Sequence, residues 1–318
     1  MIFDEIYDQL SKINSVAIFT HQNSDADALG SSIAFKLFLE KMGKNVAIFV
    51  QKPIHRNYNF LGVDKHINQS KQKYFDLALC LDCPNSSRFG IYQKKFQNIK
   101  NSIAIDHHAD FENFASINYC DSTSSSTCLL LYRFFRYIKA EITSEMALCL
   151  YSGMSTDTGR FCYSNLTPEL FEAVAVLYKV GFDYLKANYN LFQQQTRSEV
   201  ELFKCGINKI NYFENGKIAI VKIDAQDLIK TGTRPNDTYK IIDFLLNIEG
   251  VEIACLLTEY DENEYLVSIR TRNKNAQNIA KEFGGGGHLK ASGCRIFTDG
   301  NTAFKQLKQA CEKELKRE

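Results

Sequence analysis

The hydrophobic pattern of the N-terminal third alternates short apolar runs with a helical pattern. Apolar runs bounded by polar residues occur at 16–20, 45–50, 76–82 and 102–106, where β-branched and other apolar residues favour buried strands. Between the first two runs, residues 31–41 have apolar positions at helical spacing. The order strand, helix, strand predicts a parallel sheet with right-handed crossovers.

Three of these runs end in side chains that can bind metal or phosphate. Parallel strands bring their carboxyl ends to one edge of a sheet, where ligands bind. The loop after the first run is, by itself, equally consistent with an Asp-rich turn. However, acids or histidines follow three of the predicted strands, and this recurrence favours a shared site for Mn²⁺, Mg²⁺ or Zn²⁺. The residues are His21, Asp25 and Asp27 after the first run, Asp82 at the end of the third, and Asp106, His107 and His108 after the fourth.

The following segment predicts helices and one more acidic candidate. Serines 124–126 precede a helical pattern and are expected to be N-caps without a catalytic role. A helix over 143–154 leads into the loop STDTGRF, which carries Asp157, and Thr167 with Pro168 begins a helix to about Val180. Two other histidines, His55 and His66, have no neighbouring ligand residue and are expected at the surface.

The C-terminal part predicts a second, smaller α/β or α+β domain. A largely helical stretch over 183–210 leads to a strand at 217–223 and a helix at 237–246. Two strands follow around a turn at 261–263, then a helix at 275–283, the run GGGGHLKASG, a strand and a closing amphipathic helix. We therefore expect an α/β chain with a parallel-sheet domain at 1–185, a helical connector at 186–215 and a second domain at 216–318.

The glycine run at 284–287 has two interpretations. Such runs are usually flexible loops, but backbone N–H groups beside positive charge also suit a phosphate cradle. Basic residues dominate the surrounding stretch: Arg270, Arg272, Lys274, Lys281, Lys290 and Arg295.

Composition narrows the classes of function. With 318 residues, 45% of them hydrophobic, the chain is long enough for two globular domains. A net charge of +1 provides no extended track for a long nucleic acid, so short anionic substrates fit better. Ten cysteines in apolar runs, Cys80 and Cys83 of the Cys-x-x-Cys among them, indicate buried residues in a reducing compartment rather than disulfides. We expect a cytoplasmic protein without a secretory signal or membrane span.

Five motifs, in order, resemble those of the DHH phosphoesterase superfamily, and specifically its DHH/DHHA1 branch of short-oligoribonucleotide phosphodiesterases. They are HQNSDADALGS, CLDCPNSSRFG, IDHHAD, STDTGRF and GGGGHLKASG, and they extend from about residue 15 to the end of the chain. The resemblance implies an N-terminal DHH domain joined to a DHHA1 domain, and two divalent ions, Mn²⁺ with Mg²⁺ as the alternative.

The resemblance also implies a role for individual residues. His21 and Asp25 would hold one ion, Asp27, His107 and Asp157 the other, and Asp82 would bridge them. His108 would face the scissile phosphate. Asp106 would be the second catalytic residue and would orient a neighbouring side chain. The expected substrate-binding residues are Arg88, Arg270, Gly285, Gly286 and His288.

The activity implied is hydrolysis of short RNA or linear dinucleotides to 5′-mononucleotides, together with 3′-phosphatase action on adenosine 3′,5′-bisphosphate. An inorganic pyrophosphatase and a non-catalytic nucleotide-binding regulator are the alternatives, and a homodimer is compatible with the sequence.

Overall fold

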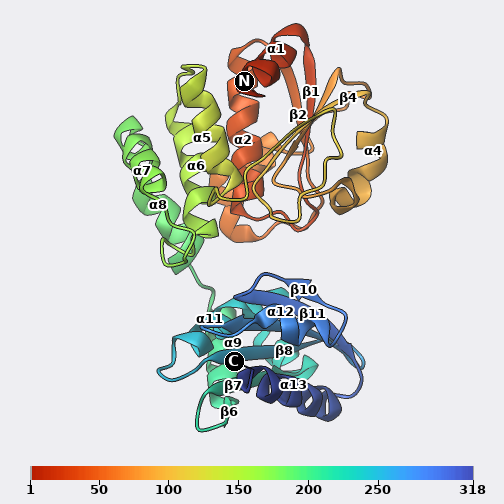
Figure 1. Cartoon of the computed structure of the whole chain (residues 1–318), viewed down its shortest axis with the longest axis vertical. Helices are drawn as coiled ribbons and strands as arrows, with labels where there is room; N and C mark the ends of the chain where they lie inside the picture. The colour runs from red at the N-terminus through yellow and green to blue at the C-terminus, as the bar shows by residue number, and fades with distance from the viewer. Residues whose placement is uncertain (1, 318) are drawn as a thin grey trace. The chain divides into compact units, whose positions relative to one another are not determined.

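The computed structural model describes residues 2–317 and forms two compact units that meet in the sequence between Gln194 and Gln195. The first unit, coloured from red to green in Figure 1, contains a five-stranded, all-parallel sheet with the spatial order β2-β1-β3-β4-β5. Because the order reverses between β1 and β3, this sheet has the switch point at which open α/β sheets bind ligands. The strands are β1 Ser15–Phe19, β2 Asn45–Phe49, β3 Leu77–Leu81, β4 Asn101–Asp106 and β5 Ile117–Cys120.

Both faces of this sheet are covered, as expected for a parallel sheet. The larger core lies against α1 (Ile2–Lys12), α2 (Ala26–Lys41), α5 (Thr127–Tyr137) and α6 (Ser144–Asp157), and α7 (Pro168–Val180) adds to it. The opposite face packs on η2 (Ser86–Tyr92) and α4 (Gln93–Gln97) through an aromatic cluster. The remaining elements are η1 (Arg56–Leu61), α3 (Val63–His66), α8 (Tyr184–Asn188) and the π-helical turn η3 (Tyr189–Gln193).

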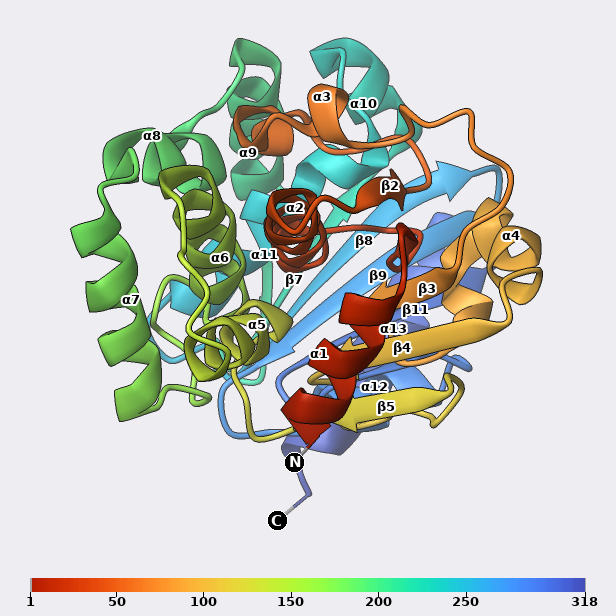
Figure 2. The same ribbon diagram turned by 90° about the horizontal axis from the view of Figure 1, so that it is seen from above.

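Two glycines let α2 and α6 approach closely, and these helices lie side by side in Figure 2. A Cβ on Gly30 would lie 2.4 Å from the carbonyl oxygen of Cys149, and one on Gly153 would lie 2.3 Å from Oδ1 of Asp27. Both distances are shorter than any real contact. The glycines therefore set the separation between the start of α2 and the end of α6.

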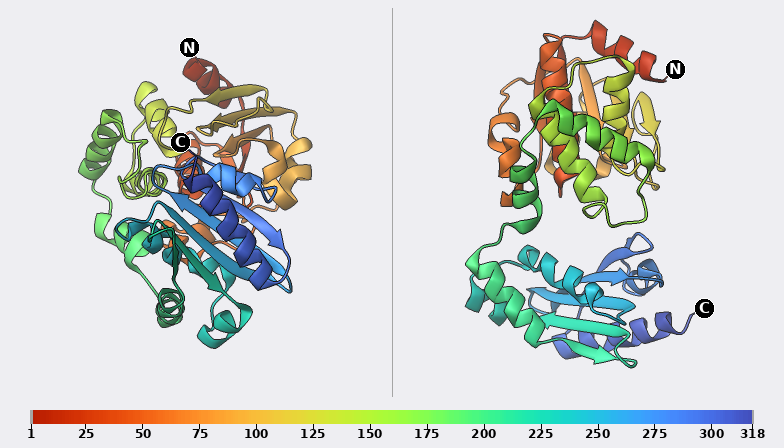
Figure 3. Two further views of the ribbon diagram at one scale, coloured as in Figure 1. Left: turned by 60° about the horizontal axis from the view of Figure 1, so that its bottom comes forward. Right: turned by 90° about the vertical axis from the view of Figure 1, so that its left-hand side faces the viewer.

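The second unit is built on a six-stranded mixed sheet with the order β10-β11-β9-β8-β7-β6, in which only β7 and β8 run parallel. One face packs on α9 (Arg197–Asn208), α10 (Ala225–Thr231) and α11 (Tyr239–Asn247). The other packs on α12 (Ala276–Lys281) and α13 (Gly300–Leu315), the long helix that crosses the strands in Figure 3. The strands are β6 Asn211–Phe213, β7 Ile218–Ile223, β8 Ile253–Asp261, β9 Glu264–Thr271, β10 Gly286–Gly287 and β11 Ala291–Phe297, and η4 (Pro235–Thr238) precedes α11.

The expected α/β class, with a parallel first sheet, is confirmed, and several details differ. Helix α2 begins at Ala26, so Asp27 lies in its first turn, and Asp157 lies in the last turn of α6 rather than in a loop. His66 is buried, not at the surface, with Nε2 3.0 Å from Oε1 of Glu145. The interpretation of all cysteines as buried is wrong for Cys120 and Cys162, which are exposed.

The segment 186–215, expected as a helical connector, is divided between the two units: α8 and η3 belong to the first unit, and α9 belongs to the second. Among the helices of residues 2–317, none is long and apolar enough to span a bilayer.

Candidate metal centre

The adjacent strands β1, β3 and β4 end at one edge of the first sheet and position the predicted ligands there. His21 follows β1, Asp82 follows β3, and Asp106 ends β4 immediately before His107 and His108. Asp82 adopts a left-handed backbone conformation with φ of +54°. Such a φ is uncommon for a residue other than glycine, although aspartate tolerates it better than most side chains do, and at functional sites it persists because the surroundings hold it.

His21, Asp25 and Asp82 form one possible ligand set, with one atom of each within 4.8 Å of the others. Nε2 of His21 lies 3.5 Å from Oδ2 of Asp82 and 3.8 Å from Oδ2 of Asp25. Asp25 is the N-cap of α2, and its Oδ1 accepts the backbone N–H groups of Asp27 and Ala28, each at 3.0 Å. The capping bonds use one oxygen and leave the other directed at His21.

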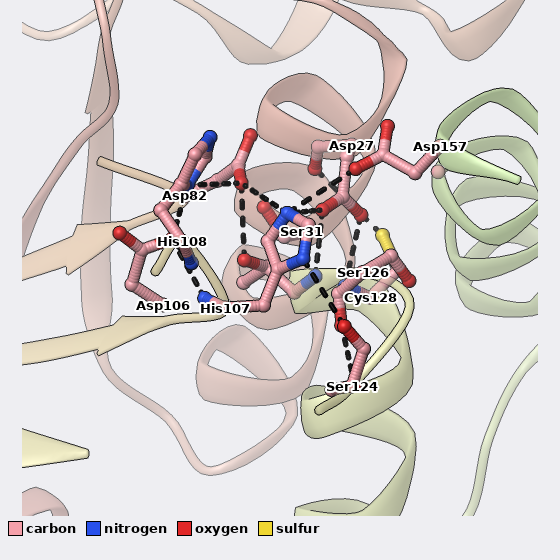
Figure 4. A network of polar contacts seen from close by, with 12 residues as sticks. Asp27, Ser31, Asp82, Asp106, His107, His108, Ser124, Ser126, Cys128 and Asp157 are labelled. Carbon is pink, nitrogen blue, oxygen red and sulfur yellow. Dashed lines mark hydrogen bonds and ion pairs between the residues drawn. The ribbon is translucent and has the colours of Figure 1, made fainter. Parts of the chain in front are cut away.

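A second possible ligand set consists of Asp27, His107 and Asp157, and again one atom of each lies within 4.8 Å of the others. Nε2 of His107 lies 3.2 Å from Oδ2 of Asp157 and 3.9 Å from Oδ2 of Asp27 (Figure 4). Nδ1 of His107 lies 3.3 Å from the carbonyl oxygen of Ser124. A carbonyl can only accept, so in the neutral imidazole Nδ1 carries the hydrogen and Nε2 presents its lone pair to the carboxylates.

Asp82 lies between the two sets. Its Oδ2 faces His21, whereas its Oδ1 lies 3.6 Å from Nε2 of His107 and 3.8 Å from Nδ1 of His108. The two oxygens of one buried carboxylate thus face different halves of the cluster. This is the geometry that a bridging ligand requires, and the assignment of the individual ligands remains a prediction.

His108 is oriented by Asp106. Oδ1 of Asp106 accepts the Nδ1–H of His108 at 2.8 Å and the backbone N–H of His107 at 2.8 Å. Because Nδ1 is occupied, Nε2 is the ring nitrogen of His108 that is available to a substrate.

The electrostatics fit a cationic group in the middle of the cluster. Burial alone would lower the pKa of His107, but Asp157, Asp27 and Asp82 raise it to about 10. Burial, together with the charges of Asp25 and Asp82, raises the pKa of Asp157 to about 7. Nε2 of His107 is buried and lies 3.2 Å from Oδ2 of Asp157, but it has no well-aligned hydrogen bond. A divalent cation would satisfy this nitrogen and neutralise the crowded carboxylates, so the residues fit divalent metal ions.

Residues at the start of α5 also contribute to the site, which the sequence did not indicate. Ser126 is the expected N-cap, and its Oγ accepts the N–H of Leu129. The neighbouring backbone, however, contacts the ligands: the carbonyl of Ser124 faces His107, and the N–H groups of Thr127 and Cys128 donate to Asp27. Backbone donors leave no signal in residue type, so only the fold could reveal them.

The expected substrate residues of the second unit gather at one hairpin. Arg270 on β9 pairs with Ala291 on β11, and the backbone N–H of the exposed His288 donates to the carbonyl of Ala291. The N–H groups of Gly284 and Gly285 donate to the carbonyls of Lys281 and Ala280, so they end α12 instead of forming a free cradle. Gly286 lies in the edge strand β10.

Five of the surrounding basic residues have local partners. Arg272, Lys274 and Lys290 donate to backbone carbonyls, and Arg295 pairs with Glu264. Arg270 likewise donates from Nη1 to the carbonyl of Ile269 at 3.1 Å, and its partly exposed guanidinium lies 3.9 Å from a carboxylate oxygen of Asp243. In the first unit, the carbonyl of Arg88 accepts the N–H of Gln22, which places Arg88 beside the loop of His21.

Comparison with known proteins supports a shared ancestry over nearly the whole chain. The bifunctional oligoribonuclease and PAP phosphatase NrnA of Thermus thermophilus is 27% identical over 307 residues, which cover 95% of this chain and 90% of the relative. The protein of the same name from Bacillus subtilis is 24% identical over 301 residues, or 92% of this chain and 93% of the relative.

A solved structure and two family descriptions agree with these relatives. The crystal structure of an exopolyphosphatase-related protein from Bacteroides fragilis matches with a TM-score of 0.92 at 25% identity, covering 98% of this chain and 96% of that one. The N-terminal domain of the DHH family matches residues 15–154, and the DHHA1 domain matches residues 215–317. The chain therefore belongs to the DHH family, in the branch that carries a C-terminal DHHA1 domain.

Proposed function

We propose that the chain is a metal-dependent phosphoesterase that hydrolyses short oligoribonucleotides and linear dinucleotides to 5′-mononucleotides. We propose that it also removes the 3′-phosphate of adenosine 3′,5′-bisphosphate. The observation that carries the proposal is the pair of ligand sets that share Asp82. The names of the Thermus and Bacillus relatives support the same activity and substrates.

In this proposal His21 and Asp25 hold one ion, Asp27, His107 and Asp157 hold the second, and Asp82 contacts both. Two such ions, when bound, stabilise the charge on phosphate oxygens and make a water nucleophile available at neutral pH. Mn²⁺ is the ion we propose, with Mg²⁺ as the alternative, because carboxylate and imidazole ligands suit both better than a thiolate set would.

The protein groups around the ions orient the substrate. His108 uses Nε2 to donate to a phosphate oxygen, while the bond from Nδ1 to Asp106 fixes the ring and favours its charged form. Arg88, Arg270, His288 and Gly286 contact the phosphates or the nucleoside, and Gly285, whose N–H is bonded to Ala280, contributes the shape of the hairpin and no free donor. A guanidinium suits contact with phosphate because it matches phosphate oxygens with two parallel donors.

Two further parts of the proposal concern the alternatives and the compartment. The DHHA1 match supports the short-RNA activity over an inorganic pyrophosphatase, since the second domain is the part in which the two would differ.

We also propose a cytoplasmic location, because all ten cysteines are free thiols, as in a reducing compartment.

The test is metal removal and restoration. Protein stripped with a chelator is assayed with a 5′-labelled diribonucleotide and with adenosine 3′,5′-bisphosphate, before and after addition of Mn²⁺, Mg²⁺ or Zn²⁺. We expect no turnover of either substrate in stripped protein and full recovery with Mn²⁺. Binding of the dinucleotide without product release in any metal would instead support the non-catalytic regulator.

A further inference from the structure

The first turn of α5 contacts two of the proposed metal ligands: Asp27, which we assign to the second ion, and Asp82, which we assign to both. The backbone N–H of Thr127 donates to Oδ2 of Asp27 at 2.6 Å, and the N–H of Cys128 donates to Oδ1 of Asp27 at 2.9 Å. The hydroxyl of the same Thr127 donates to Oδ1 of Asp82 at 3.1 Å. Figure 4 shows the contact between Cys128 and Asp27 within the polar network of the site.

These bonds matter because the carboxylates are buried. Asp27 and Asp82 are 0% and 1% exposed, and Thr127 is itself fully buried. A buried carboxylate without donors is costly, and the N-terminus of a helix supplies both N–H donors and a favourable dipole. Asp27 therefore has a fixed orientation before any ion binds.

The hydroxyl acts on the shared ligand. Oδ1 is the oxygen of Asp82 that faces His107 and the second ligand set. A donor on this oxygen limits rotation of the carboxylate about its Cβ–Cγ bond, so Oδ2 stays directed at His21. One side chain thus links the orientation of the bridging carboxylate to that of Asp27.

We infer that Thr127 is a positioning residue, whose hydroxyl and backbone N–H together hold Asp82 and Asp27 in the orientation that two ions require. This inference rests on the proposed function. Thr127 contacts neither a reacting atom nor substrate in this account, so its effect passes through the two aspartates.

The test uses two substitutions that separate the hydroxyl of Thr127 from its methyl group. Thr127→Val keeps the shape and the backbone N–H but removes the donor, whereas Thr127→Ser keeps the donor. Thr167→Val is the matched control, because Thr167 caps α7 through Oγ1 and that helix carries no proposed ligand. Each metal-stripped variant is titrated with Mn²⁺ by calorimetry, and dinucleotide turnover is measured at saturating Mn²⁺.

We expect Thr127→Val to weaken binding of at least one Mn²⁺ by about 10–100-fold, the usual effect of losing a partner of a metal ligand. Its kcat should fall while its KM for the dinucleotide stays within about threefold, since a residue that acts through metal ligands leaves substrate binding in place. Thr127→Ser should restore both quantities, and Thr167→Val should lower the melting temperature without changing Mn²⁺ affinity.

Three results would overturn the inference. Wild-type Mn²⁺ affinity in Thr127→Val would show that the hydroxyl does not position Asp82. Equal losses in Thr127→Ser and Thr127→Val would assign the effect to packing. The third result is an unsubstituted protein that neither binds Mn²⁺ nor releases mononucleotide. In that case the proposed function itself is wrong, and the inference fails with it. The first two results, in contrast, require an unsubstituted protein that is active.

Discussion

Asp82 has three histidines around a single carboxylate, and this crowding determines its charge. Burial would raise the pKa of Asp82, but hydrogen bonding and charge from His21, and the charges of His107 and His108, hold it below its ordinary value. The group is therefore an anion in the metal-free protein, ready to bind cations without first losing a proton.

Asp82→Asn tests this role, because it keeps the shape of the side chain and removes the charge. We expect bound Mn²⁺, measured by elemental analysis, to fall below two ions per chain, and kcat/KM to fall by at least about 10²-fold. Asp64→Asn, an exposed acid in the same unit, is the control and should retain both. Two tightly held ions with near-normal turnover in Asp82→Asn would refute the bridging assignment.

The residues that could be predicted from the sequence are those whose type carries the chemistry. His21, Asp82 and His107 were identified because acids and imidazoles recur at the ends of apolar runs. Thr127 and Cys128 were not, because their backbone donors look like those of any helix start. His66 was misplaced because its partner, Glu145, is 79 residues away in the sequence.

At the scale of elements, the α2–α6 contact determines where Asp27 and Asp157 lie. Gly153→Ala would gain about 1 kcal/mol from helix propensity. However, the new methyl group would lie 2.9 Å from the Cα of Asp27, and this backbone cannot rotate away. Overpacking of this kind costs about 1–3 kcal/mol, so we expect lower stability in urea unfolding together with weaker Mn²⁺ binding.

Gly206→Ala is the matched control for this helix contact. Gly206 is a helical glycine of the second unit, and its added Cβ would meet the side chain of Ile241. The nearest atom is the rotatable Cδ1 of Ile241, at 2.7 Å, so this change should alter stability only slightly and leave Mn²⁺ binding unchanged. Normal Mn²⁺ affinity in Gly153→Ala would mean that helix separation does not set the geometry of the site.

A second element-scale prediction concerns the start of the sheet and its dependence on pH. The backbone N–H groups of Asn14 and Ser15, and the hydroxyl of Ser15, donate to Oδ2 of Asp76 and lower its pKa. A lowered pKa means that the folded state favours the anion. The Asp76 anion therefore contributes fully to the free energy of unfolding above its unfolded-state pKa of about 3.9. This contribution is lost as the pH falls through its folded-state pKa.

Asp76→Ala should accordingly melt at a lower temperature than the wild type at pH 7. Because Asp76 is exposed, the effect should be modest. As the pH falls below the lowered folded-state pKa, the two melting temperatures should converge, since both proteins then lack the anion. A difference that does not shrink as the solution is acidified would show that charge at Asp76 does not contribute.

The elements that the sequence did not predict are short and depend on their partners. β5 has four residues, none of them fully buried, and it exists through its pairing with β4. β6 and α10 have three and seven residues, too few for a periodic pattern to be distinguished. The longer elements, such as α7 with its Thr167 cap and Pro168, could be predicted because capping and periodicity agree.

We propose that the two units of the molecule have different tasks. The first would provide the metal ligands, and Arg270 and His288 of the second would bind substrate. We expect Arg270→Ala and His288→Ala to keep the metal content of the wild type, to raise the KM and to lower kcat to a smaller extent.

Arg272→Ala is the control for this division, because Arg272 donates to the carbonyls of Val251 and Leu246 and should affect stability rather than KM. Loss of metal in Arg270→Ala or His288→Ala would contradict the assignment of these residues to substrate.

If the carboxylate cluster around Asp82 is a catalytic centre for short RNA, turnover must depend on RNA length and on Asp82. Release of 5′-mononucleotide is measured at fixed Mn²⁺ and salt for RNAs from two to 24 nucleotides, with the wild type and Asp82→Asn in parallel. We expect the highest kcat/KM for substrates of about two to five nucleotides, a shallow salt dependence because few phosphates are engaged, and little turnover in Asp82→Asn. Rates that rise with length and fall steeply with salt, or wild-type turnover in Asp82→Asn, would contradict this expectation.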